Sequence, residues 1–574
     1  MKKIAVSCLF MAFCFGAAAH STGHPSFHDA MASVTERLRS QKDAEELRRI
    51  DPEDIVPLLN EEERHVMATE YLSFEVDEPV VVWVAREARQ REVPFWLEQE
   101  GFEKTDEEIV AGEETYELWR KPFDAGGVGL GYSGFRLHRR HYFVVVTPQE
   151  RGAEVEIDHM YPGRHRVLTC EEGARVYGDE PEIRVEEIPP TLDGHMLVQA
   201  IQDRAEESQL THIWRSTPHP SSKAPDQIVL TWSDDPTTTQ TIQWRTSPEV
   251  DDGVVRYREK GAEDFEVVQA QGQPFEDPYL ANDAVNHRFT AVLTGLEPDT
   301  TYTYVVGSPA VGSWSDEAGF TTAPAAPEPF SFVYMGDAQN GLETWGKLLQ
   351  EAYDSHPEAR FYVMAGDLVN RGNDRDDWDA FFAGAEGVYD RRPVLPAMGN
   401  HEYHGSDGPY MYREIFDLPE NGPEDLTPEH AYTVTYGNAL FVILDSNQSP
   451  REQADWLEEQ LRSSDATWKF VSYHHPMYSS APDRDNPLVR KYWGPLFDKY
   501  HVDFALQGHD HAYLRTPPMK DGEQMDSAAD GTYYVVSVSG TKYYNQVERD
   551  YVAVGMQKTS TFQVLDITID EIGR

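Results

Sequence analysis

Short apolar runs in the C-terminal part of the chain end in side chains that commonly bind metal ions. Each run is long enough for one buried strand, and a carboxylate, an amide or an imidazole follows it within a few residues. The residues concerned are Asp337, Asp367, Asn400, His474, His509 and His511. Carboxylate and amide oxygens with imidazole nitrogens suit a pair of hard-to-borderline metal ions that share one carboxylate. Two ions about 3.5–4 Å apart can bind a nucleophilic hydroxide and stabilise an in-line displacement at phosphorus.

These side chains can meet only if the apolar runs are strands of one α/β domain. The runs lie at 330–335, 361–365, 394–398, 439–444, 470–473 and 504–507, and helical periodicity fills the intervals at 342–353, 374–389, 454–462 and 488–500. Alternating strands and helices predict a sheet with helices on its faces, and ligands bind at the carboxyl ends of such strands. We therefore expect the six residues at a single rim of a domain spanning 330–574.

The preceding segment, 225–323, has the pattern of a β-sandwich, because runs with strand periodicity recur in it at short, regular intervals. Its piece Gly295–Tyr302 resembles the tyrosine corner of fibronectin type III domains, in which Tyr302 would bond back to the chain before it. A Pro- and Ala-rich linker, 323–329, follows. The sandwich alone would support only an interaction or spacer role.

The ordered motifs identify a family resemblance. Gly-Asp at 336–337, Gly-Asp-x-x-x-Arg-Gly at 366–372, Gly-Asn-His-Glu at 399–402, His-His-Pro at 474–476 and Gly-His-x-His at 508–511 are similar to those of the calcineurin-like metallophosphoesterases. With the sandwich in front, the chain most resembles the purple acid phosphatase branch over roughly 225–545. The resemblance implies an αββα-type layered domain after the sandwich.

The resemblance also implies roles for individual residues. Asp337 and His511 would bind the first metal, and Asp367 would bridge the two. Asn400, His474 and His509 would complete the second. His401 would contact the phosphate or protonate the leaving group, held in place by Glu402.

The roles of four further residues stay open. Arg371 resembles a phosphate-clamping arginine, but a salt bridge to Asp374 or Asp376 is an equal alternative. His475 is expected to be structural or to exchange roles with His474. Asn447 is expected to support a ligand. Arg484 stands where the family has a substrate-side histidine pair, and a phosphate contact is one interpretation.

Two departures from the family pattern bear on the metals. Purple acid phosphatases have a tyrosine three residues after the bridging aspartate, and here that residue is Asn370; many other members have a histidine where this chain has Gln339. Gln339 is expected to substitute through its amide oxygen, a weaker donor. We therefore predict two divalent ions (Fe, Mn, Zn or Mg) and no purple colour.

Composition sets the broader class. The chain has 574 residues, too many for one core, so several domains are expected. Its 100 Asp and Glu residues against 50 Lys and Arg residues give a formal net charge of −50. This balance excludes a dedicated nucleic-acid binder, and a 40% hydrophobic content excludes general disorder.

Residues 1–19 have the pattern of a secretory signal peptide, and no later run predicts a membrane span. Two of the three cysteines lie in that leader, so Cys170 would remain without a partner. A helical lead-in at 20–69 and a mostly β domain of unknown role at 70–215 are expected before the sandwich.

The sequence therefore predicts a periplasmic or secreted dimetal phosphoesterase that hydrolyses small phosphate monoesters with a metal-bridging hydroxide. A phosphodiesterase or nucleotide hydrolase with the same site is the alternative enzyme. A non-catalytic binding or adhesion protein on a relic site is the alternative from another class, with the β domains offering surfaces for protein contact.

Overall fold

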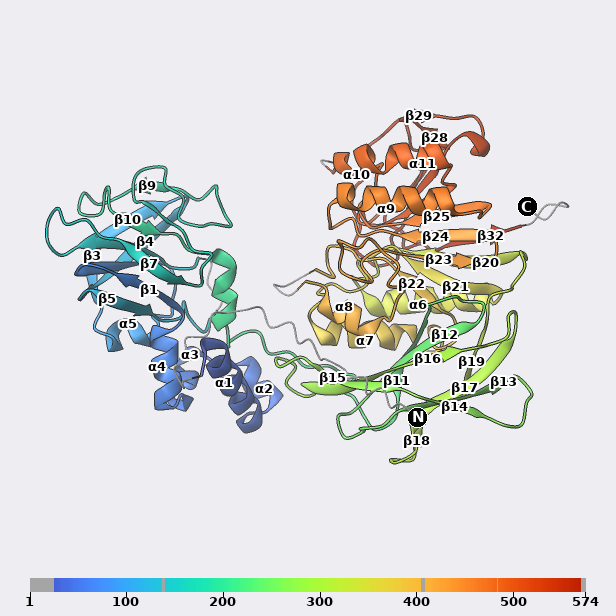
Figure 1. Ribbon diagram of the computed structural model, residues 1–574, viewed down its shortest axis with the longest axis horizontal. Coiled ribbons are helices and arrows are strands. Elements are labelled where there is room, and N and C mark those ends of the chain that lie inside the picture. Colours follow the sequence, from blue (N-terminus) through green and yellow to red (C-terminus); the bar gives the residue numbers. More distant parts are fainter. Residues whose placement is uncertain (1–24, 137–139, 404–407, 483, 569–574) are drawn as a thin grey trace, which may run out of the picture. The chain divides into compact units, whose positions relative to one another are not determined.

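The computed structural model describes residues 25–136, 140–403, 408–482 and 484–568, and the chain divides into two compact units between Trp214 and Arg215 (Figure 1). The expected leader at 1–19 lies outside the described residues. Among the described helices, none combines the length and the apolar character needed to cross a bilayer.

The first unit begins with helices and continues as two antiparallel sheets. The helices are α1 (Phe27–Gln41), α2 (Ala44–Arg48), α3 (Pro52–Ile55) and α4 (Glu61–Thr69), with α5 (Phe95–Gln99) further on. In α1 the residues Met31, Val34 and Leu38 are buried, as their spacing on one helical face requires. A three-stranded sheet has the order β5 (Gly126–Leu130), β1 (Leu72–Val76), β7 (Ile157–Tyr161). A seven-stranded sheet has the order β8 (Val167–Thr169), β10 (Met196–Val198), β6 (Phe143–Pro148), β2 (Val80–Glu87), β4 (Glu114–Phe123), β3 (Glu103–Ala111), β9 (Val185–Glu187).

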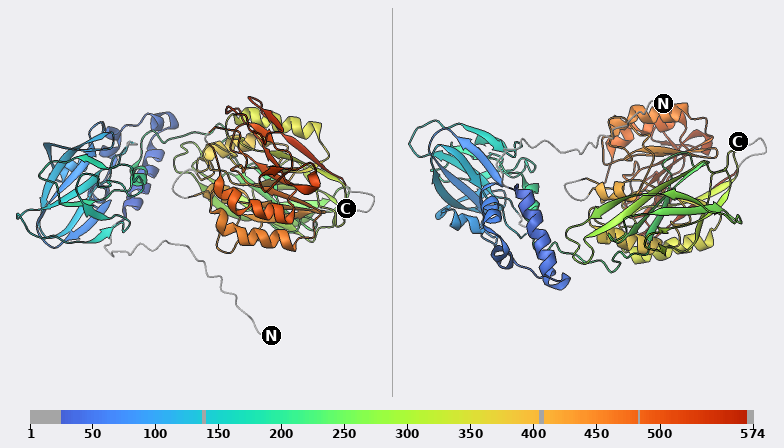
Figure 2. Two further views of the ribbon diagram at one scale, coloured as in Figure 1. Left: turned by 90° about the horizontal axis from the view of Figure 1, so that it is seen from above. Right: turned by 60° about the horizontal axis from the view of Figure 1, so that its bottom comes forward.

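The second unit opens with the β-sandwich. One sheet has the order β11 (Asp226–Thr231), β12 (Thr239–Thr246), β16 (Val285–Thr294), β15 (Gln271–Glu276). The other contains β14 (Glu266–Gln269), β13 (Val254–Glu259), β17 (Thr301–Ser308), β18 (Ser313–Trp314) and β19 (Ala318–Thr321), which pairs with β17. The tyrosine corner is present, because the Tyr302 hydroxyl accepts a hydrogen bond from the Glu297 N–H at 2.9 Å. Figure 2 shows these green strands beside the yellow-to-red layers of the same unit.

The C-terminal domain has four layers, which confirms the predicted αββα-type fold. One sheet has the order β22 (Val394–Pro396), β21 (Ala359–Met364), β20 (Phe330–Met335), β32 (Gln563–Ile567). The other has the order β23 (Tyr432–Tyr436), β24 (Ala439–Ile443), β25 (Trp468–Ser472), β26 (Phe504–Gln507), β30 (Tyr533–Val536), β27 (Tyr513–Arg515), β31 (Val554–Met556). The helices are α6 (Leu342–Ser355), α7 (Arg375–Ala385), α8 (Tyr410–Ile415), α9 (Pro450–Ser463), α10 (Pro487–Tyr492) and α11 (Gly494–Tyr500).

Aromatic packing joins the two sheets back to back. Phe332 of β20 lies 5.1 Å from Phe441 of β24 and 5.2 Å from Phe470 of β25, measured between ring centroids. On the outer faces, α6 and α7 pack on the first sheet through residues such as Trp345 and Phe381, and α9 and α11 pack on the second through residues such as Leu457. The strands that carry the motif residues are parallel within each sheet. Their carboxyl ends therefore meet across the junction of two sheets, not along one.

Candidate metal centre

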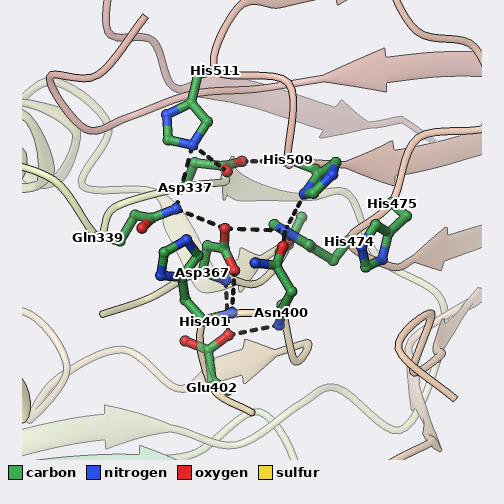
Figure 3. A network of polar contacts seen from close by, with 12 residues as sticks. Asp337, Gln339, Asp367, Asn400, His401, Glu402, His474, His475, His509 and His511 are labelled. Carbon is green, nitrogen blue, oxygen red and sulfur yellow. Dashed lines mark hydrogen bonds and ion pairs between the residues drawn. The ribbon is translucent and has the colours of Figure 1, made fainter. Parts of the chain in front are cut away.

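Two groups of acidic and imidazole donors meet at this junction and share one residue. Asp367, His474 and His509 form one group, and Asp337, Asp367 and His511 form the other; within each, the ligand atoms lie within 4.8 Å of one another. Both carboxylates are buried, with 0% of Asp337 and 1% of Asp367 exposed. Figure 3 shows the imidazoles gathered around the two carboxylates. Such a pair of donor sets with a common carboxylate could hold two cations side by side.

Backbone carbonyls orient two of the histidines. The Nδ1 atom of His474 lies 2.9 Å from the Ala365 carbonyl oxygen, and Nδ1 of His511 lies 3.1 Å from that of Lys542. Because a carbonyl only accepts, both Nδ1 atoms carry a hydrogen, and each ring would offer Nε2 to a bound metal ion. These Nε2 atoms face the carboxylates, at 3.1 Å from Asp367 and 3.5 Å from Asp337 respectively. This carbonyl support is typical of metal-ligating histidines.

His509 and Asn400 complete the second group. The Nδ1 atom of His509 is 3.1 Å from His474 Nε2, and the Oδ1 atom of Asn400 is 3.2 Å from the same nitrogen. The backbone N–H of His509 donates a hydrogen bond to Asp337 Oδ2 at 2.6 Å, which connects the two groups. An amide oxygen, two imidazole nitrogens and a carboxylate oxygen thus point at one place.

The buried carboxylates of this cluster favour the binding of cations. Burial raises the pKa of Asp337 well above its ordinary value, and its Oδ1 atom is buried without a hydrogen-bond partner. Burial also tends to raise the pKa of Asp367, but the contact with His474 outweighs it and lowers the pKa to about 2. A buried, unpartnered carboxylate oxygen is costly in an apolar interior, and a bound cation removes that cost. The residues present therefore fit a pair of metal ions.

Four of the clustered residues have left-handed backbone conformations. The φ angles are 49° at Asp337, 52° at Asp367, 73° at His509 and 43° at His511. Such values are uncommon outside glycine, although Asp and His adopt them more readily than most residues. The sharp turn directs each side chain back across the end of its strand, where the donors meet.

The motif glycines leave room for the carboxylates. A Cβ atom on Gly399 would lie 2.1 Å from Asp367 Oδ1, and one on Gly508 would lie 2.4 Å from Asp337 Oδ2. Both separations are far inside van der Waals contact, so any side chain at these two positions would displace a candidate ligand.

Glu402 supports the loops and not the imidazole of His401, so that part of the expectation is wrong. Its carboxylate accepts N–H hydrogen bonds from Asp367 at 2.9 Å, Leu368 at 2.8 Å and Gly399 at 2.6 Å. The His401 ring instead bonds through Nδ1 to the Asn370 carbonyl at 2.6 Å. That bond fixes the Nδ1 hydrogen and leaves Nε2 of the half-buried ring free to exchange a proton.

Gln339 lies among the candidate ligands, but its amide nitrogen faces them. Nε2 donates to Asp367 at 2.7 Å and lies 3.3 Å from His511 Nε2, while Oε1 accepts from Asn340 at 3.1 Å. Rotating the Gln339 amide by 180° would exchange Oε1 and Nε2, which are nearly the same size.

The remaining predicted residues lie at or beyond the edge of the cluster. Arg371 pairs with Asp374 at 3.3 Å, with 53% of its side chain exposed, and contacts none of the described donors. Asn447 bonds to Asp445 at 2.9 Å and to the Met398 carbonyl at 3.3 Å.

Two of the predicted residues adjoin His509. His475 bonds to Ser446 at 2.8 Å, and its ring centroid lies 4.3 Å from that of His509. Arg484 contacts His509 Nε2 directly.

Two residues beside the cluster, Lys542 and Tyr544, were not assigned from the sequence pattern. Lys542 supplies the carbonyl that orients His511, and the Tyr544 ring packs on the His511 imidazole with centroids 4.7 Å apart. Both follow the carboxyl end of β30, which is parallel to β26. The strand-end rule that located the other residues would have located these, had 533–536 been included among the strands.

Comparison with known proteins agrees with this architecture. The family model for the purple acid phosphatase N-terminal domain matches residues 225–322, and the calcineurin-like phosphoesterase model matches residues 330–513. An uncharacterised protein of Mycobacterium tuberculosis is 28% identical over 326 residues, covering 49% of this chain and 60% of that protein. The Fe(3+)-Zn(2+) purple acid phosphatase 12 of Arabidopsis thaliana is 24% identical over 318 residues, covering 52% and 66%.

The chain thus spans about three fifths to two thirds of the length of these relatives. Among solved structures, the purple acid phosphatase PPD1 from yellow lupin (Lupinus luteus) seeds aligns with a TM-score of 0.53 and 16% identity. That alignment covers 86% of this chain and 89% of the lupin chain, and it supports the fold.

Proposed function

We propose that this chain, in which a calcineurin-like phosphoesterase domain follows a purple acid phosphatase N-terminal domain, is an exported, dimetal-dependent hydrolase of phosphate monoesters. The observation that carries the proposal is the sharing of Asp367 between two donor groups whose ligand atoms lie within 4.8 Å of one another. A relic site would have no need to fill every position of the second group, Asp367, Asn400, His474 and His509, as this chain does.

We assign the ligands by position. Asp337, Asp367, His511 and, after rotation of its amide, Gln339 would hold one ion; Asp367, Asn400, His474 and His509 would hold the other. Two bound divalent ions supply a nucleophile at neutral pH and stabilise negative charge on phosphorus. Asn370 cannot provide the phenolate that gives ferric purple acid phosphatases their colour, which favours two divalent ions (Fe, Mn, Zn or Mg).

The chain's own residues would manage the proton and the substrate. Nε2 of His401 is free because the Asn370 carbonyl holds Nδ1, so an imidazolium there could donate a proton to the leaving oxygen. Arg371 would have to exchange Asp374 for the substrate before clamping a phosphate. Export rests on the leader pattern at 1–19 and is tested by cell fractionation.

The decisive test combines turnover with metal content. We expect the metal-loaded protein to hydrolyse nitrophenyl phosphate faster than the bis-nitrophenyl diester, and the reverse order would indicate the phosphodiesterase. Asp367→Asn should lose both bound metal and turnover, whereas Asp465→Asn, an exposed substitution of the same kind, should lose neither. A binding or adhesion protein on a relic site predicts no turnover in the unsubstituted chain with any of the four metals.

A further inference from the structure

A tyrosine with two neighbouring cations lies on the His509 and His511 side of the site. The Arg484 guanidinium carbon is 5.0 Å from the Tyr544 ring centroid, and the Lys542 ammonium is 5.3 Å from it. The Tyr544 N–H donates to the His511 carbonyl at 3.1 Å, which fixes the tyrosine beside that candidate ligand. Cations within about 6 Å of an aromatic ring are held by its quadrupole.

Each cation adjoins one of the histidines. Arg484 contacts Nε2 of His509, and the backbone carbonyl oxygen of Lys542 lies 3.1 Å from Nδ1 of His511. Arg484 lies 3.4 Å from Asp510, its one carboxylate neighbour among the residues that the structure describes. Lys542 makes no ion pair with any residue that the structure describes. The two side chains thus bring positive charge to one side of the cluster, and a single carboxylate within the described part of the chain offsets it.

The backbone of this segment is anchored to the metal-ligand loops. The N–H groups of Ser539, Gly540 and Thr541 donate to the carbonyls of Gly336, Asp337 and Asn340 at 2.7, 2.8 and 2.7 Å respectively. Lys542 and Tyr544 therefore follow a segment with a fixed position relative to the candidate ligands.

This arrangement is unusual for the chain's charge. Carboxylates outnumber cationic side chains by 100 to 50, yet Lys542 has no ion-pair partner among the described residues and lies next to a site that would hold cations. An uncompensated cation beside bound cations is unfavourable unless an anion joins it. The reacting phosphate would be bound by the metal ions near His401, whose backbone N–H donates to Asp367 at 2.9 Å. Arg484 and Lys542 lie on the His509 and His511 side, so an anion that contacts both of them would be a second group.

We propose that Arg484 and Lys542 form a subsite for a second anionic group, so that the preferred substrates are phosphate monoesters whose alcohol carries a carboxylate or another phosphate. This inference rests on the proposed function and names its substrate class. Charge-assisted hydrogen bonds from arginine and lysine suit both kinds of anion.

The kinetic experiment compares three aryl esters: phenyl phosphate, 4-carboxyphenyl phosphate and hydroquinone bisphosphate. We expect the wild-type protein to prefer at least one charged ester over phenyl phosphate in kcat/KM by roughly tenfold, the effect of one charge-assisted hydrogen bond. Lys542→Met should abolish most of that preference, and Lys542→Arg should retain it. Lys520→Met removes the same charge from β28 (Met519–Lys520), away from the site, and should change nothing.

A binding measurement tests the subsite without turnover. Calorimetric titration compares phenylphosphonate with 4-phosphonobenzoate, neither of which can be hydrolysed. We expect the carboxylated ligand to bind more tightly to the wild-type protein and equally to Lys542→Met. If phenyl phosphate is not hydrolysed at all, the proposed function fails, while this titration still decides whether the subsite exists.

Two outcomes would overturn the inference. An equal fall in kcat/KM for all three esters in Lys542→Met would show that the cations bind the reacting phosphate. No difference between the two phosphonates in the wild-type protein would show that the cations have only a structural role.

Discussion

Replacing Glu402 by glutamine tests how the site is held in shape. The two carboxylate oxygens accept four N–H hydrogen bonds, from Asp367, Leu368, Val369 and Gly399. A glutamine has one acceptor oxygen, so at least one of these buried N–H groups would face an amide nitrogen that cannot accept. Loss of one bond to a charged group costs about 1.5–3 kcal/mol. At about 1.4 kcal/mol per tenfold change, metal affinity should fall roughly 10- to 150-fold.

The measurement is a competition between the protein and a chelator for Zn²⁺ or Mn²⁺ at pH 8, with far-UV circular dichroism to check folding. Glu343→Gln, an exposed change of the same kind on α6, is the control. Burial, with the nearby Asp367 carboxylate, raises the pKa of Glu402 to about 7. The wild-type group is therefore ionised at pH 8 and protonated near pH 5.5, where the two proteins should converge. Metal affinity within twofold of wild type at pH 8 would refute the reasoning.

Three further predictions concern the glycines, pH and salt. Gly508→Ala places a Cβ atom 2.4 Å from Asp337 Oδ2 and should lower metal affinity at least tenfold in the same competition assay, while Gly127→Ala, where the added atom meets nothing within 4 Å, should not. Burial raises the pKa of Glu429 from 4.5 to about 7, so the folded state holds this proton more tightly and stability should fall as pH rises from about 4.5 to 7. In thermal unfolding, the free energy of unfolding of Glu429→Gln relative to that of the wild-type protein should therefore rise by about 2–3 kcal/mol between about pH 4.5 and 7. A difference between the two proteins that does not change with pH would contradict this. Because the net charge of −50 repels anions, moderate salt should raise kcat/KM for phosphate esters, and a steep fall would show that the local field of the site governs capture.

The strands that carry the motifs could be predicted from the sequence because each is a short apolar run that ends in a polar group. The runs at 330–335 and 504–507 coincide with β20 and β26. The division of the strands between two sheets could not be predicted, because hydrophobic periodicity reports burial and not which strand is the neighbour. β32 illustrates this: it pairs with β20 across more than two hundred residues of sequence, and only one of its five residues, Ile567, is buried.

The site was predictable in its residue types and less so in its supporting contacts. Ligand candidates such as Asp337 and His511 follow strand ends, so the strand-end rule applies to them directly. The carbonyls of Ala365 and Lys542 that orient two histidines have no side-chain signature at all. His401 likewise bonds to a backbone carbonyl, that of Asn370, which no side chain reveals. For this reason the sequence suggested Glu402, wrongly, as the partner of the His401 ring.

The left-handed residues give an argument that is independent of the motifs. Backbone conformations of this kind cost of order 1–3 kcal/mol each outside glycine and persist only where the surroundings impose them. Asp337, Asp367, His509 and His511 all adopt one, and all four belong to the two donor groups. A core selected for stability alone would relieve such strain by placing glycine at these turns. The strain has instead been kept together with side chains that can bind cations, so positioning those side chains accounts for it, and this favours an active metal centre over a structural relic.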